Sequence, residues 1–98
     1  MWRIGLALMI AGNAMADTPS LERQRVLKDM LLNDCGACHG LTLKGGLGSA
    51  LTTEALANKD TDLLVNTVLQ GKKGTAMPAW GEIVSQQDAI WLIKYLKK

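Results

Sequence analysis

The chain has 98 residues and a formal net charge of +2 at pH 7, and 48% of its residues are hydrophobic. This length is enough for one domain and not for two. A net charge so close to zero excludes the large basic surface on which nucleic-acid binding depends, so no nucleic-acid partner is expected.

The first 16 residues predict a secretory signal peptide. Arg3 supplies a short positive region, an apolar run follows from Ile4 to Ala11, and Ala14-Met15-Ala16 is a small-residue cleavage site. The apolar run is about half of the roughly 20 residues that a membrane-spanning helix needs, which argues against a permanent anchor. We therefore expect export, cleavage after residue 16 and no stable membrane insertion of the mature domain, residues 17–98.

Two helices are predicted in the first three quarters of this domain. Thr18 and Pro19 are typical of a helix start, with a capping hydroxyl followed by proline in the first turn, and helical spacing of apolar residues continues to Asn33. The second helix begins at the capping residue Asp60 and ends at Gly71, because glycine readily adopts the left-handed stop conformation.

The third predicted helix begins at the C-terminal quarter of the chain. Residues 85–88 resemble a capping box, with Asp88 where Glu or Gln is usual, and apolar residues follow at helical spacing. Loops over 41–58 and 71–82 separate the helices, with one short turn expected near Thr53–Ala57. No alternating strand pattern extends beyond a few residues, so the sequence predicts one compact all-α domain.

The sequence CGACH, residues 35–39, contains Cys35, Cys38 and His39, and three interpretations of it fail. A thioredoxin-like redox pair would need a βαβ context, and strands are not predicted. A structural zinc site needs four ligands, whereas the chain has two cysteines and one histidine. A disulfide across so short a loop would contribute little stability. None of the three accounts for His39.

Cys-x-x-Cys-His is the attachment sequence of c-type haem. The two thiols add to the two vinyl groups on one edge of the porphyrin, and the next residue places an imidazole beneath the iron. We therefore expect one covalently bound haem c, with thioether bonds at Cys35 and Cys38 and with His39 as the proximal iron ligand. Such attachment takes place outside the cytoplasm, which agrees with the export signal.

A second axial ligand is expected on the other face of the iron, and Met77 is the prediction. It lies in a loop and precedes Pro78, which stiffens the backbone. Met30 lies on the apolar face of the first helix and is better explained as core packing. Apolar residues between His39 and Met77 are expected to line the haem: Leu41, Leu43, Leu47, Leu51, Leu56, Leu64 and Val68.

The segments CGACHG, TAMPAWG and IWLIKYLKK resemble the class I cytochromes c, over essentially all of residues 17–98. Two stretches show a further resemblance, CGACHGLTLKGGLGSALTTEAL and MPAWG. They resemble the small periplasmic cytochromes made alongside cytochrome cd nitrite reductase in denitrifying bacteria, and also the haem c domain of that reductase. The resemblance implies a class I cytochrome c fold, with three main helices and loops around one haem, in the periplasm. It also implies that the terminal helices cross, with Tyr95 or Trp91 packed near Leu27 or Met30.

The sequence departs from the class I pattern at one point. Many members have Gly-Pro soon after the haem histidine, and its backbone carbonyl orients the imidazole. Here Gly45-Gly46-Leu47-Gly48 contains no proline. We therefore expect a different carbonyl, within residues 44–50, to accept a hydrogen bond from His39.

With both axial positions filled, small ligands are kept from the iron, so we expect a monomeric one-electron carrier and not an enzyme. The resemblance implies cytochrome cd nitrite reductase, or the proteins that mature its haem, as the redox partner. Docking is expected at the exposed haem edge, with positive charge from Lys72 and Lys73. Two alternatives remain: a haem-based ligand binder in which Met77 does not bind iron, and a haem-containing maturation factor that does not act by electron transfer.

Overall fold

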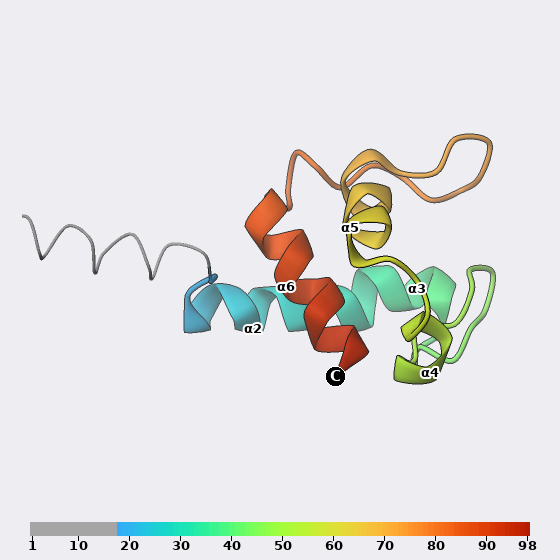
Figure 1. The fold of residues 1–98 in the computed structure, drawn as a ribbon, viewed down its shortest axis with the longest axis horizontal. Helices are drawn as coiled ribbons and strands as arrows, with labels where there is room; N and C mark the ends of the chain where they lie inside the picture. Colours follow the sequence, from blue (N-terminus) through green and yellow to red (C-terminus); the bar gives the residue numbers. More distant parts are fainter. Residues whose placement is uncertain (1–17) are drawn as a thin grey trace, which may run out of the picture.

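The computed structural model describes residues 18–98, so the expected signal peptide and its cleavage site lie outside the described residues. The helices of this part are α2 (Leu21–Met30), η1 (Leu31–Cys35), α3 (Gly36–His39), α4 (Thr53–Leu56), α5 (Thr61–Gln70) and α6 (Gln86–Lys97) (Figure 1). Residues 18–98 contain no β-strand, which confirms the all-α prediction. Within the same range, no helix has the length and apolar character to cross a membrane.

The first three elements form one continuous helical segment, which the sequence prediction ended too early. Helical conformation does not stop at Asn33 but continues through a π-helical turn, η1, and into α3. A π turn inserts a wider loop of backbone into a helix and is frequent at functional sites. As a result, Cys35, Cys38 and His39 all lie on helix.

The start of this segment also differs from the prediction. Ser20 is the N-cap, and its side chain accepts a hydrogen bond from the backbone N–H of Arg23 at 3.1 Å. Thr18 and Pro19 therefore precede the helix and do not begin it. Serine is among the best capping residues, since its hydroxyl satisfies an N–H that has no partner inside the helix.

The predicted boundaries of the later helices are confirmed. Asp60 caps α5, with its carboxylate accepting from the Leu63 N–H at 3.0 Å, and Gly71 ends the helix with a φ of 76°. Ser85 and Asp88 form the capping box of α6. The short turn expected near Thr53–Ala57 is α4.

Helix α6 crosses α2 and also packs against α4 and α5, so it is the centre of the fold (Figure 1). The buried apolar core is made of Leu27, Leu31, Leu56, Val65, Val84, Ala89, Leu92, Ile93 and Leu96.

The aromatic residues of α6 also meet α2. The ring of Tyr95 stacks on Trp91 at a centroid distance of 5.2 Å, and the Lys28 ammonium lies 5.3 Å from the Tyr95 ring centroid. The predicted crossing of the terminal helices is confirmed, and the α2 residue at the Tyr95 ring is Lys28, next in sequence to the predicted Leu27.

Candidate haem site

The Cys-x-x-Cys-His sequence occupies the junction between η1 and α3. Cys35 is the last residue of the π turn, while Cys38 and His39 end α3. Both cysteines are half-buried free thiols. Burial raises the pKa of the Cys35 thiol, and the negative charge of the adjacent Asp34 raises it further. One helical segment thus presents two free thiols and an imidazole within five residues.

The imidazole of His39 is oriented by a backbone carbonyl. Its Nδ1 lies 2.7 Å from the carbonyl oxygen of Ser49. Because a carbonyl oxygen can only accept, Nδ1 must carry the proton, and Nε2 keeps its lone pair for a metal. Ser49 lies within residues 44–50, so the expectation of a replacement for the missing proline carbonyl is confirmed.

The loop that supplies this carbonyl is bonded to the helix that carries the histidine. The backbone N–H of Gly45 donates to the His39 carbonyl at 2.8 Å, and that of Gly48 donates to the Cys38 carbonyl at 2.7 Å. The last carbonyls of a helix have no partner within it, so these bonds satisfy them. The loop after α3 is therefore a fixed part of the site.

Met77 lies in the loop between α5 and α6 and is half-buried. Its carbonyl accepts from the Lys72 N–H at 3.2 Å, and its own N–H donates to Thr75 Oγ1 at 3.2 Å. A Cβ atom at Gly71 would lie 2.9 Å from the Met77 carbonyl oxygen, so the chain can close this loop only with glycine there.

The far end of the Met77 loop is held on α5. The N–H of Trp80 donates to the Val68 carbonyl at 3.0 Å, and the N–H of Gly81 donates to the Leu69 carbonyl at 3.1 Å. Figure 1 shows this loop and the loop after α3 extending toward the same end of the molecule. The structure thus places the Met77 loop and the loop that follows His39 at one end of the fold.

The residues predicted to line the haem fall into three groups. Half-buried residues that pack against the core are Leu43, Leu51, Leu64 and Val68. Leu41 and Leu47 are 77% and 94% exposed. Leu56 is only 2% exposed, and protein atoms alone cover it, so it is a core residue.

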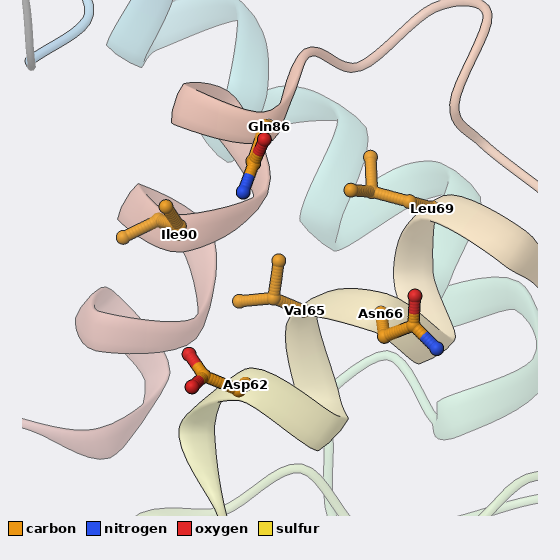
Figure 2. Close-up of a pocket in the computed structure, with 6 residues that line it drawn as sticks. All are labelled: Asp62, Val65, Asn66, Leu69, Gln86 and Ile90. Atoms are coloured by element: carbon orange, nitrogen blue, oxygen red, sulfur yellow. The ribbon is translucent and has the colours of Figure 1, made fainter.

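Two shallow cavities lie away from the Cys-x-x-Cys-His sequence. The first, of about 280 Å³, lies between α5 and α6 and is lined by Asp62, Val65, Asn66, Leu69, Gln86 and Ile90 (Figure 2). The second, of about 360 Å³, is lined by Leu69, Ala79, Gly81, Glu82 and Ile83. Neither lining includes Cys35, Cys38, His39 or Met77.

In residues 18–98, no cluster of three or more His, Cys, Asp or Glu side chains is placed to hold a metal ion.

Residues 12–96 match the family model described as cytochrome c oxidase, cbb3-type, subunit III. The chain belongs to this family of c-type cytochromes. The cytochrome is 50% identical over 97 residues to cytochrome c55X of Stutzerimonas stutzeri, covering 96% of this chain and 86% of the relative. It is 43% identical over 99 residues to cytochrome c55X of Paracoccus denitrificans, covering 100% of this chain and 96% of the relative.

Solved structures also resemble the cytochrome. The c-type cytochrome NirC superposes with a TM-score of 0.80 at 52% identity, covering 81% of this chain and 93% of NirC. The dihydro-haem d1 dehydrogenase NirN superposes with a TM-score of 0.66 at 27% identity, over 72% of this chain and 15% of NirN. The cytochrome therefore has the class I cytochrome c fold of NirC.

The family carries covalently bound haem c, and the site described above fits this cofactor. Cys35 and Cys38 are free thiols, and the hydrogen bond at Nδ1 of His39 leaves Nε2 available to iron. The cytochrome contains one such sequence and is a monohaem protein of the electron-carrier type. The sequence pattern located these three residues. It did not identify Gly48, which lies against the imidazole, because the lack of a side chain gives no positive signal.

Proposed function

We propose that the cytochrome is a periplasmic one-electron carrier of nitrite respiration. Cys35 and Cys38 form the two thioether bonds, and His39 is the proximal iron ligand. The observation that carries the proposal is the hydrogen bond of 2.7 Å between Nδ1 of His39 and the Ser49 carbonyl. It fixes the tautomer that a haem histidine requires and orients the ring so that the other nitrogen can bind iron.

Met77 is proposed as the distal iron ligand. The second methionine of residues 18–98, Met30, lies in α2 and packs against the protein core, where it has a sufficient structural role. Met77 instead lies in a loop held by backbone hydrogen bonds at both ends. A haem with His and Met ligands supplies an iron centre of raised potential that exchanges one electron. Since His39 is the only histidine and is committed to iron, a catalytic base is not expected and the cytochrome is not an enzyme.

The periplasmic location rests on residues 1–16. Arg3, the short apolar run and the small residues at 14 and 16 form a signal peptide cut after Ala16, which makes Asp17 the first residue of the mature protein. The intact mass of the exported cytochrome tests this. A mass that retains residues 1–16 would mean a tethered protein and would contradict the proposed processing.

The proposed partner is cytochrome cd nitrite reductase or a protein that matures its haem. Resemblance to cytochromes made alongside that reductase supports this, as do the neighbours NirC and NirN. Charge supports an acidic partner surface, because the loops over 40–52 and 71–85 contain three basic residues, Lys44, Lys72 and Lys73, and one acidic residue, Glu82. Unlike charges across an interface speed the encounter of two proteins.

Stopped-flow mixing of the reduced cytochrome with oxidised, purified cytochrome cd nitrite reductase tests the electron-carrier role. Oxidation of the cytochrome that keeps pace with reduction of the enzyme is the expected result. Binding without electron transfer would favour the maturation factor that does not act by electron flow. An iron that is five-coordinate and binds CO in the isolated protein would favour the ligand binder.

A further inference from the structure

The imidazole of His39 has a second close neighbour in the loop that follows it. A Cβ atom built on Gly48 would lie 2.8 Å from Nδ1, 2.8 Å from Cε1 and 3.3 Å from Cγ of His39. These distances place that point over the face of the ring, because a point in the ring plane beyond the Nδ1–Cε1 edge would be much farther from Cγ. The backbone of Gly48 therefore lies against one face of the imidazole.

Space, and not backbone conformation, requires glycine at this position. Gly45 in the same loop has a φ of 117°, in the region that favours glycine, whereas Gly48 is not among the residues with positive φ. Gly48 is also held firmly, because its N–H donates to the Cys38 carbonyl at 2.7 Å and its carbonyl accepts from the Gly46 N–H at 3.0 Å. Since Cys38 directly precedes His39, the contact is built into the site.

We propose that Gly48 is a positioning residue that sets the plane of the His39 imidazole. The Ser49 carbonyl fixes the direction of the Nδ1–H bond, and the backbone of Gly48 limits the tilt of the ring about that direction. The orientation of the ring and the hydrogen bond at Nδ1 both influence the reduction potential of a metal bound at Nε2. Gly48 thus acts on the iron through His39, and the inference rests on the proposed role of His39 as an axial ligand.

Substitution Gly48→Ala in the holocytochrome tests this role. The added methyl group must displace either the ring or the loop, so we expect shifted EPR g values, a changed pattern of haem methyl proton shifts in the oxidised protein, and a shifted reduction potential. Ser20→Ala is the control. Ser20 caps the start of α2, where its hydroxyl accepts from the Arg23 N–H at 3.1 Å, so the substitution costs stability without involving His39 or the Met77 loop.

The control should lose stability and keep the wild-type g values and methyl shifts. Unchanged g values and methyl shifts in Gly48→Ala would overturn the inference, as would equal changes in both variants. A second measurement needs no variant. In the reduced wild-type protein, a nuclear Overhauser effect is expected between the Gly48 Hα and the His39 Hε1 protons, and its absence would also overturn the inference.

The oxidised wild-type protein tests the assignment of His39 as an iron ligand independently of the role of Gly48. Hyperfine-shifted ring protons of His39 in the oxidised wild type are expected if His39 binds iron. Their absence would contradict the proposed ligand itself. Their presence, together with an unchanged pattern in Gly48→Ala, would contradict only the positioning role of Gly48.

Discussion

Arg23 on α2 and Asp88 on α6 form an ion pair in which Nη2 and Oδ2 are 2.9 Å apart. The guanidinium makes a second hydrogen bond to the same oxygen through Nε, at 3.1 Å, and donates from Nη2 to the Ile83 carbonyl at 2.8 Å. Asp88 also accepts from the Ser85 N–H as part of the capping box. One carboxylate thus caps α6 and joins it to α2.

Replacement of Asp88 by alanine should destabilise the cytochrome. The substitution removes a helix cap and leaves the Arg23 guanidinium without its partner, and we expect a loss of about 2–4 kcal/mol in the free energy of unfolding. Urea unfolding followed by far-UV circular dichroism measures it. Asp29→Ala, at an exposed position of α2, is the control and should change this free energy by no more than about 0.5 kcal/mol. Equal unfolding midpoints for the two variants would contradict the role of Asp88.

The Arg23–Asp88 pair should make stability depend on pH in the acid range. Burial raises the pKa of Asp88, but hydrogen bonds from Arg23 and Ser85 and the Arg23 charge outweigh it and hold the pKa below its ordinary value. A lowered folded-state pKa stabilises the protein in full above the ordinary value of about 3.9, and this contribution is lost as pH falls through the folded-state pKa.

The comparison of wild type with Asp88→Asn isolates this effect. The difference in free energy of unfolding between the two should be constant near neutral pH and should shrink as pH falls below about 4. Both proteins have the same haem site, so any loss of stability at that site at low pH cancels in the difference between their free energies of unfolding. A difference that stays constant down to low pH would show that Asp88 does not act as a carboxylate.

Met77→Ala should open the sixth coordination position of the iron. Because a thioether ligand raises the potential of haem iron and keeps other ligands off, we expect a shift toward high spin, a lower reduction potential and binding of CO. Absorption spectra with and without CO, together with a redox titration, measure all three. Met30→Leu, a substitution of similar volume next to the core, should leave them unchanged. CO binding by the Met30 variant and not by the Met77 variant would reverse the ligand assignment.

The double substitution Lys72→Glu and Lys73→Glu should slow electron transfer to an acidic partner at low ionic strength. At high ionic strength the rates of variant and wild type should converge, because salt screens charges at the surface. Stopped-flow rates over a series of salt concentrations provide the measurement. Lys94→Glu with Lys98→Glu makes the same change in net charge at exposed positions near the end of α6. If both double variants react equally slowly, the effect belongs to net charge and not to the Met77 loop.

The sequence by itself determined the helix signals that act over a few residues, and the haem-attachment chemistry. Asp60 and Ser85 cap their helices as predicted, because a cap bonds to an N–H group only three positions away. Cys35, Cys38 and His39 are similarly local, since their spacing alone identifies the cofactor. The predicted helix start at Thr18 was wrong. Ser20, two residues later, is an equally good capping residue, and it is the N-cap in the structure.

Only the tertiary structure decided the contacts between segments. Seven carbonyls were open to His39 within residues 44–50, and the backbone hydrogen bonds of the loop place that of Ser49 at Nδ1. The face contact of Gly48 depends on the same fold of the loop. Arg23 and Asp88 lie 65 positions apart and meet because apolar burial makes α2 and α6 cross. Such pairings depend on how the core packs as a whole, and no short stretch of sequence encodes that arrangement.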